Sequence, residues 1–344
     1  MKKFLAAESH NDLLNFCKAH NIPSFRAKQI ASWIFDHCII EPDKMKNLPL
    51  ELRDSLKKEY FAPSSIICER AACSRDGVEK LMLQLHDQEC IEMVLIPSPE
   101  RMTFCLSTQV GCPVKCRFCA SGKLGLVRNL TAGEMLEEFL IGCSITGRPD
   151  NLVFMGIGEG LLNFDNLALT LERLSGEFNF APRRITVSTS GYIPGMKRFA
   201  ALKKEYLLAV SLHAVDDETR AKLIPPHLRY SIAEILRAAD EIRDASNRHY
   251  TLEYTLIAGI NDSLEAAEKL GKIAFDHHAK VNLIPFNETG SEFRRPTPEV
   301  IAAFEKTVAS RGARVTTRVE KGSGETAACG QLRIKHIQKK GDKI

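Results

Sequence analysis

The sequence lacks any apolar run long enough to cross a membrane. A helical span needs about 20 apolar residues, whereas the apolar part of the first stretch, MKKFLAAESHNDLL, covers only residues 4–7. A secretory signal also needs a longer apolar region than this. We therefore expect a cytoplasmic protein with no membrane association.

A strong charge of one sign is also missing. The 47 Lys and Arg residues nearly balance the 43 Asp and Glu residues, which leaves a formal net charge of +4. This small excess permits a polyanionic partner without requiring one. With 44% hydrophobic and 26% charged residues, the composition is that of an ordinary globular protein. Folding of 344 residues therefore needs no metal or disulfide.

Cysteine, by contrast, is abundant. A reducing cytoplasm keeps thiols unpaired, so clustered cysteines are better read as metal ligands or reactive groups than as disulfides. Of the eleven cysteines, several are scattered and are interpreted as inert thiols: Cys17, Cys38, Cys68, Cys73, Cys90 and Cys143. Cys112, Cys116 and Cys119 instead form a tight C-x3-C-x2-C cluster in the stretch FCLSTQVGCPVKCRFCASGKLG.

No second C-x-x-C accompanies this cluster, and structural zinc sites usually need four ligands. A four-iron cluster held by three thiolates would instead leave one iron open to a small chelating ligand. The alternative is a three-cysteine zinc site completed by Cys105 or a histidine, in a zinc-containing RNA-binding protein. The spacing favours the iron–sulfur interpretation.

From about residue 100, short apolar strands alternate with helical segments, which is typical of an α/β fold with a parallel sheet. Strands are expected at 103–108, 151–156, 184–191, 207–214, 251–259 and 280–287, with a late strand near 313–319. Six such units predict a partial (β/α)6 barrel. Helices are expected between them at 132–143, 164–176, 194–204, 231–245 and 263–278.

The chain divides into four expected segments. Residues 1–62 read as a small helical domain, with amphipathic helices near 9–20, 24–37 and 47–60. Residues 63–97 form a linker in which KLMLQLH and CIEMVLI predict a β-hairpin. The barrel covers residues 98–335, and a basic tail follows at 336–344.

Five of the predicted strands end in polar or glycine residues: STQVG, GIGEG, STSG, SLHA and PFN. The loops beyond the carboxyl ends of strands form the active sites of α/β folds. Serine and glycine also suit plain turns, but five such ends in succession indicate a site.

C-x3-C-x2-C after the first barrel strand resembles the signature of radical S-adenosylmethionine (SAM) enzymes. The resemblance implies that Cys112, Cys116 and Cys119 hold a [4Fe-4S] cluster whose open iron binds SAM. It also implies that the strand-end loops bind SAM, with Glu159 placed to pair with an ammonium group. The implied cofactor-binding residues are Gly158, Glu159, Ser188, Ser211, Leu212, His213 and Asn287.

The motifs CLSTQVGCPVKCRFCASGKLG, GIGEGLLNFDN, LAVSLHA, VNLIPFN and AACGQL occur in this order. Together they resemble the RlmN/Cfr family of radical SAM RNA methyltransferases, over residues 20–335. The family implies that Cys329 carries a methyl group from one SAM, while a second SAM supplies the radical. It further implies that Cys105 resolves the product through a transient disulfide with Cys329, and that Glu92 accepts a proton.

The implied reaction is methylation of carbon 2 of an adenine in 23S rRNA, and also in tRNA. A Cfr-like enzyme acting at carbon 8 is the nearest alternative, and a radical SAM enzyme with another substrate is a further one. We expect a monomer that receives electrons from a flavodoxin- or ferredoxin-type donor. Basic residues expected to contact RNA are Lys123, Arg128, Arg183, Arg184, Arg294, Arg295, Arg314 and Arg318.

Overall fold

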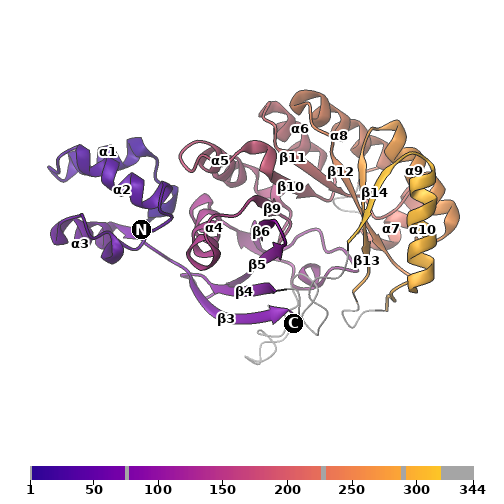
Figure 1. The fold of residues 1–344 in the computed structure, drawn as a ribbon, viewed down its shortest axis with the longest axis horizontal. Coiled ribbons are helices and arrows are strands. Elements are labelled where there is room, and N and C mark those ends of the chain that lie inside the picture. Colours follow the sequence, from indigo (N-terminus) through magenta and orange to yellow (C-terminus); the bar gives the residue numbers. More distant parts are fainter. Residues whose placement is uncertain (1, 74–76, 226–229, 288–291, 319–344) are drawn as a thin grey trace.

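The computed structural model describes residues 2–73, 77–225, 230–287 and 292–318 (Figure 1). A curved sheet runs through the larger part of the molecule, and its helices lie on the outer side. Among the described residues, no helix is long and apolar enough to span a bilayer.

Ten strands form the main sheet, in the order β14-β13-β12-β11-β10-β9-β6-β5-β4-β3. The strands from β6 through β9 to β14 pair in parallel, as predicted for the barrel. They are β6 (Arg101–Cys105), β9 (Asn151–Phe154), β10 (Ile185–Thr189), β11 (Leu207–Ser211), β12 (Thr251–Leu256), β13 (Lys280–Pro285) and β14 (Arg314–Thr317). This arrangement confirms the α/β partial barrel.

The predicted hairpin is present as β4 (Val78–Gln84) and β5 (Cys90–Ser98). It is not a separate unit, because β5 also pairs with β6 and β3 (Ile66–Cys73) pairs with β4. Three antiparallel strands thus extend the barrel sheet past its first parallel strand. The sequence did not predict this continuity, because pairing partners depend on register rather than on the pattern of one strand.

The helices that cover the sheet are α4 (Ala132–Thr146), α5 (Phe164–Ser175), α6 (Ile193–Ala201), α7 (Asp217–Leu223), α8 (Ile232–Ser246), α9 (Leu264–Asp276) and α10 (Pro298–Ser310). Five of these helices were predicted, whereas α7 and α10 were not. Ser231 and Thr131 are the N-caps of α8 and α4, and both form capping boxes. Each hydroxyl accepts a hydrogen bond from a backbone N–H in the first turn, and the Glu at that position accepts one from the backbone N–H of the N-cap residue. Short 3-10 turns at Ala120–Leu124 and Gly160–Asn163 lie in the site loops.

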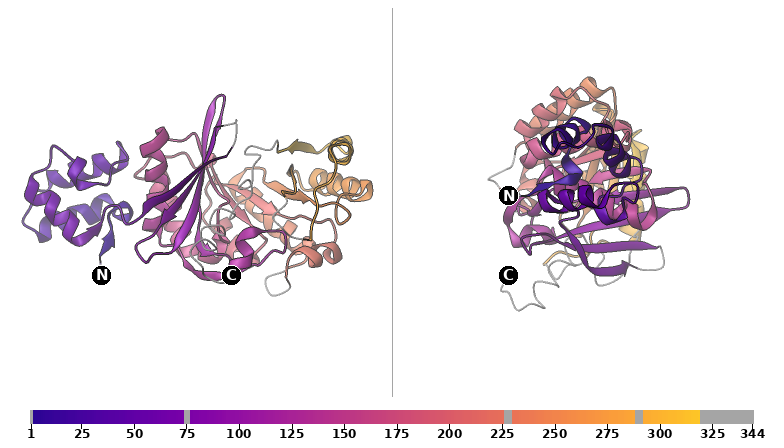
Figure 2. Two further views of the ribbon diagram at one scale, coloured as in Figure 1. Left: turned by 90° about the horizontal axis from the view of Figure 1, so that it is seen from below. Right: turned by 90° about the vertical axis from the view of Figure 1, so that its left-hand side faces the viewer.

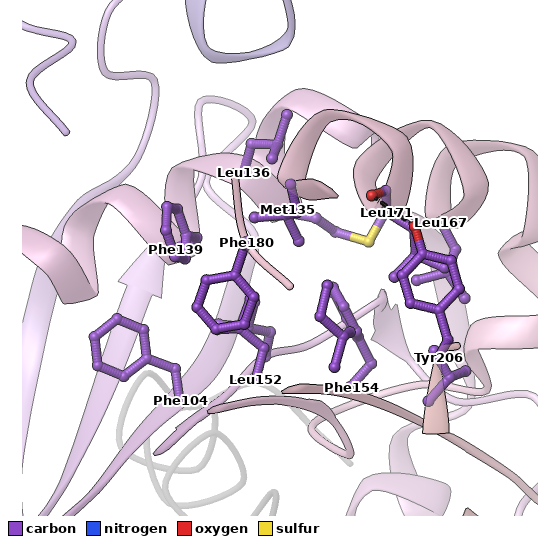
Figure 3. Packing of buried hydrophobic residues seen from close by; sticks show 14 of the residues in the cluster. Phe104, Met135, Leu136, Phe139, Leu152, Phe154, Leu167, Leu171, Phe180 and Tyr206 are labelled. Atoms are coloured by element: carbon purple, nitrogen blue, oxygen red, sulfur yellow. Dashed lines mark hydrogen bonds between the residues drawn. The ribbon is translucent and has the colours of Figure 1, made fainter. Parts of the chain in front are cut away.

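Side chains alternate between the two faces of each parallel strand. Phe104, Leu152 and Phe154 point outward and pack beneath Met135 and Phe139 of α4 (Figure 3). The residues between them, such as Cys105 and Val153, point to the opposite face. That inner face lines the lumen of the partial barrel and carries most of the polar strand residues.

The N-terminal helices gather at one end of the molecule, away from α9 and α10 (Figures 1 and 2). They are α1 (His10–Ala19), α2 (Phe25–Phe35) and α3 (Leu50–Glu59), close to the predicted ranges. A short strand pair, β1 (Lys3–Phe4) with β2 (Tyr60–Phe61), ties their two ends together. This unit meets the barrel at α4, where Phe4 occupies the space that a Cβ on Gly133 would need.

Two further contacts join the N-terminal helices to the barrel. Arg148 donates a hydrogen bond to the Phe35 carbonyl over 3.2 Å, and the Phe35 and Phe178 rings meet edge to face at 5.0 Å. Next to them, the thiols of Cys38 and Cys143 are hydrogen-bonded to each other. The scattered cysteines predicted to be inert therefore include one pair in contact at this boundary.

A buried carboxylate fixes the linker to the barrel. Glu137 of α4 is fully buried and accepts hydrogen bonds from the backbone and hydroxyl groups of both Ser64 and Ser65, over 2.7–3.2 Å. Burial raises the pKa of Glu137, and the serine donors oppose that rise. One side chain thus satisfies the polar backbone at the start of β3.

We expect Glu137→Ala to lower the free energy of unfolding by about 2–3 kcal/mol, because the donors of buried Ser65 and half-buried Ser64 would lose their acceptor. Chemical denaturation followed by circular dichroism measures this loss. Glu241→Ala, at an exposed position of α8, is the control and should change stability by less than about 0.5 kcal/mol. Equal losses in the two variants would contradict the anchoring role of Glu137.

Candidate active site

The cysteine cluster lies in a loop bracketed by a small antiparallel sheet. Strand β7 (Gln109–Gly111) precedes the loop and β8 (Leu126–Asn129) follows it. The Cys112 backbone N–H donates to the Gly125 carbonyl over 2.8 Å, which closes the loop. The three thiols therefore belong to one short segment beyond the carboxyl end of β6, and a hydrogen bond joins the two ends of that segment.

Apolar side chains surround the cluster loop. Val114, Cys112, Cys116 and Phe118 pack against residues from the loops beyond the later strands. Those residues are Leu223, Ile224, Ile257, Ile260, Phe286 and Phe293. Burial raises the pKa of the Cys112 thiol to about 12 and also raises the pKa of the Cys116 thiol well above its usual value, and the nearby Cys119 and Glu159 add to both increases. The three thiols and Glu159 thus share one dry region.

These residues fit an iron–sulfur cluster. Thiols are the ligands such clusters take, and Ser121, two residues past Cys119, buries a hydroxyl that has no hydrogen-bond partner among the described residues. No group of three His, Cys, Asp or Glu side chains in the described ranges could hold a single metal ion. A four-iron cluster does not need such convergence, because each thiolate binds a different iron.

Glu159 lies in the loop after β9 and is buried to 4% exposure. Its carboxylate accepts the backbone N–H of Ser190 at 2.6 Å and that of Leu161 at 3.3 Å, while burial raises its pKa. Its own N–H donates to the Gln109 side chain at 2.8 Å. The carboxylate is therefore fixed at the end of β9, beside the cysteine loop.

Gly158 has a φ of +115°, and a Cβ there would lie 2.6 Å from the Thr108 hydroxyl. At Gly156, a Cβ would lie 2.7 Å from the Leu106 carbonyl oxygen. Glycine at these two positions therefore lets the loop after β9 approach the end of β6.

His213 follows β11 in a left-handed conformation, with a φ of +57°. Its Nδ1 accepts the backbone N–H of Thr255 at 3.0 Å, so the ring proton is on Nε2. Burial, together with the positive charge of Arg220, lowers the pKa of His213 to about 3, which keeps the imidazole neutral. The ring meets Phe118 of the cysteine loop edge to face at 4.7 Å.

The remaining predicted cofactor residues lie at the same edge of the sheet. Ser188 and Ser211 are half-buried near the ends of β10 and β11, and Leu212 is fully buried. Asn287, beyond β13, accepts a hydrogen bond from Arg295 at 3.5 Å. The carboxyl ends of the strands thus gather the whole predicted set that the structure describes.

Glu92 and Cys105 lie on the inner face of neighbouring strands. Cys105 pairs with Val94, and Glu92, two residues along β5, points the same way. Both are buried, to 2% and 5% exposure. Cys329 lies outside the described residues.

Ser107 connects these groups. Its hydroxyl donates to the Glu92 carbonyl at 2.7 Å and accepts the Ile157 N–H at 3.0 Å. Its backbone N–H donates to buried Glu138 at 2.9 Å. One serine therefore holds the strand of Glu92, the end of Cys105's strand and the glycine loop in register.

Sequence reasoning missed two buried residues that fix the strand ends. Arg220, fully buried, donates to the carbonyls of Ser190 at 2.5 Å and Leu212 at 3.3 Å. The Asn261 amide donates to the carbonyls of His213 and Thr255, each at 2.7 Å. Arg220 stands in the polar helix DETRAKL, so no local pattern marked it as buried, and its partners depend on the fold.

Of the basic residues expected to contact RNA, Arg128 is already paired. Its guanidinium contacts Asp87 at 2.7 Å and Glu134 at 2.8 Å. Arg314 lies on the inner face of β14. Lys123, Arg183 and Arg184 are exposed, and their contact with RNA stays a prediction.

Comparison with known proteins agrees with this geometry. Residues 106–270 match the radical SAM superfamily, and residues 5–61 match the ribosomal RNA large subunit methyltransferase N-terminal domain. The structure is similar to a radical SAM methyltransferase from Sphaerobacter thermophilus, with a TM-score of 0.90 and 37% identity, over 96% of this chain and 98% of that one. Radical SAM enzymes use a [4Fe-4S] cluster and SAM, which the site residues fit.

Full-length relatives are equally similar. A probable dual-specificity RNA methyltransferase RlmN from Akkermansia muciniphila is 40% identical, over 98% of both chains. A protein with the same description from Clostridium perfringens is 40% identical over 97% of both chains, and the dual-specificity RNA methyltransferase RlmN of Nitratiruptor is 40% identical over 91% of this chain and 94% of that one. The chain therefore belongs to the RlmN family of radical SAM RNA methyltransferases.

Proposed function

We propose that this enzyme methylates carbon 2 of an adenine in 23S rRNA and in tRNA, through a methyl group carried on Cys329. The observation that supports this most is the placement of Glu92 and Cys105 on one face of the lumen, next to the loop of Glu159. A proton acceptor and a second thiol thus lie together beside the residues that suit SAM. Residues 1–62 would act as an RNA-binding accessory domain, and residues 63–97 would link it to the barrel.

Cys112, Cys116 and Cys119 would hold the [4Fe-4S] cluster, and Glu159 would pair with the SAM ammonium group. When bound, the cluster and SAM supply a 5′-deoxyadenosyl radical, a step that the protein directs by orientation and exclusion of water. The apolar side chains around the cysteine loop provide that exclusion. The neutral His213 offers its Nε2 proton to a ligand while Thr255 fixes the ring.

Carbon 2 of adenine is electron-poor, so direct displacement of a methyl group from SAM would fail there. A carbon-centred radical on the Cys329 methyl group can add to this carbon instead, which joins the enzyme to RNA through a thioether. The adduct radical would then give up one electron, which the oxidised cluster would accept, and Glu92 would take the ring proton. Cys105 would attack the Cys329 sulfur, so that a disulfide forms as the sulfur–carbon bond to the RNA breaks, and the released carbon would take a proton to become the methyl group.

The partners follow from this chemistry. The base must leave its stack to reach the lumen, and a one-electron carrier of the flavodoxin or ferredoxin class would reduce the cluster. We propose that the protein acts in the cytoplasm as a monomer.

Anaerobic incubation of the reconstituted enzyme with SAM, a reductant and 23S rRNA fragments or tRNA should yield 2-methyladenosine, measured by mass spectrometry of RNA nucleosides. Cys329→Ala should abolish the product, because no residue would carry the methyl group. Cys17→Ala, at a buried position of α1, is the matched control and should keep activity. Formation of 8-methyladenosine alone would favour Cfr-like chemistry, and turnover by Cys329→Ala would exclude the methyl-carrier mechanism.

We expect Cys105→Ala to form the thioether to RNA but to release it slowly, because no second thiol attacks Cys329. The adduct should appear as a ribonuclease-sensitive band of higher mass on a denaturing gel, and its amount should approach one RNA per enzyme. Cys90→Ala, buried on β5, serves as the control and should turn over without an adduct. Multiple turnovers at the wild-type rate in Cys105→Ala would refute the resolving role.

A further inference from the structure

The barrel lumen contains a cavity that the assigned site residues do not line. Its volume is about 550 Å³, and it is bounded by the inner faces of β10 to β14 and by Met155 beyond β9. Most of the strand residues that line the cavity are polar, including Thr251, Glu253, Asn282 and Thr316. Strand register accounts for this, since Glu253 pairs with Asn282, and Asn282 with Thr316.

Glu253 is the acidic residue of this cavity, and it is buried to 7% exposure. Its Oε2 accepts a hydrogen bond from the Asn282 amide nitrogen at 2.6 Å. The Asn282 amide oxygen in turn accepts from the Thr316 hydroxyl at 3.5 Å, which orients the amide. Within the described ranges, Oε1 of Glu253 accepts no hydrogen bond.

The charges around Glu253 leave it available to a ligand. Burial raises its pKa to about 7, against the opposing effects of the Asn282 hydrogen bond and of the positive charge on Arg318. Lys280 and Arg314 also line the cavity, but neither forms an ion pair with Glu253, and both are exposed to solvent. Oε1 of Glu253 is not among the fully buried side-chain atoms that lack a partner in the described residues, so a donor that enters the cavity can reach it.

The cavity lies on the methyl-transfer side of the site. Met155 lines it and also packs against the apolar group that contains Cys105. Glu159 and His213, which suit SAM, are not among its lining residues. A ligand here would therefore lie between Met155, beside the resolving thiol, and Glu253, whose strand partner is Ser211.

We propose that Glu253, oriented by Asn282, recognises the exocyclic amino group of the target adenine. This inference rests on the proposed function and adds a specificity-determining residue to it. The free Oε1 accepts a hydrogen bond from the amine. A base with a carbonyl at that position, such as guanine or hypoxanthine, would place oxygen against oxygen. Lys280 and Arg314, at the open part of the cavity, suit the phosphates beside the base.

Glu253→Gln tests the proposal by reversing the hydrogen-bond polarity. The Asn282 N–H keeps an oxygen opposite itself, so the introduced amide nitrogen would face the ligand. The adenine amine would then face another N–H donor and form no hydrogen bond. The carbonyl oxygen of hypoxanthine would accept a hydrogen bond from the same N–H. The substitution changes neither side-chain length nor shape.

The experiment compares RNA stem-loops that carry adenosine or inosine at the target position. Binding is measured by fluorescence anisotropy with the reconstituted holoenzyme, and methylation by kcat/KM. Wild-type enzyme should prefer adenosine, and Glu253→Gln should reduce the adenosine-to-inosine ratio by about 10- to 100-fold in both measurements. Glu241→Gln, the same substitution at an exposed position of α8, is the matched control and should keep the wild-type ratio.

Other outcomes are equally informative. An unchanged ratio in a folded Glu253→Gln would overturn the proposal. A larger dissociation constant for SAM together with an unchanged ratio would also overturn the proposal. Glu253 would then accept a hydrogen bond from a ribose hydroxyl of the cofactor. Thr316→Val releases the Asn282 amide and should shift the ratio in the same direction but less, which covers the case in which Glu253→Gln does not fold. Wild-type preference in binding without any methylation would contradict the proposed function alone.

Discussion

The two-faced character of the parallel strands is the constraint on which the site depends. Each strand places apolar side chains under the helices at every second position. The residues between them do not pack against helices and face the lumen. Phe104 packs beneath α4, and Cys105 beside it consequently points inward. A shift of one residue in register would bury the thiol under a helix and expose the phenyl ring to the site.

The sequence predicted the strands and helices of the barrel well, because apolar runs bounded by polar ends are a local pattern. It also located the cysteine loop and the polar strand ends. It did not predict that β3, β4 and β5 extend the same sheet, and it missed Glu253 and Asn282. Glu253 interrupts the apolar stretch TLEYTL, which marks it as inward-facing, but its partner follows only from the register of β12 with β13.

Contacts between backbone and buried polar side chains assemble the site, and these are hard to read from sequence. Ser107 joins two strands and the glycine loop, and Arg220 joins two strand ends through carbonyl oxygens alone. Neither residue belongs to a recognisable spacing. Their effect is cooperative, since a satisfied buried network fixes each loop relative to the others, whereas a single lost partner leaves a costly unpaired group. Contacts within the protein itself therefore hold the site residues in place.

The position of Cys105 sets a length requirement for the proposed pair of thiols. Cys105 is fixed on β6, in the middle of the ten-stranded sheet, while β14 forms its far edge. Six strand spacings of about 4.8 Å separate β6 from β14, roughly 29 Å along the sheet. Eleven residues separate Arg318 from Cys329, and an extended chain of that length reaches about 36 Å. The chain beyond β14 is thus long enough to bring Cys329 to Cys105, and curvature of the sheet shortens the path further.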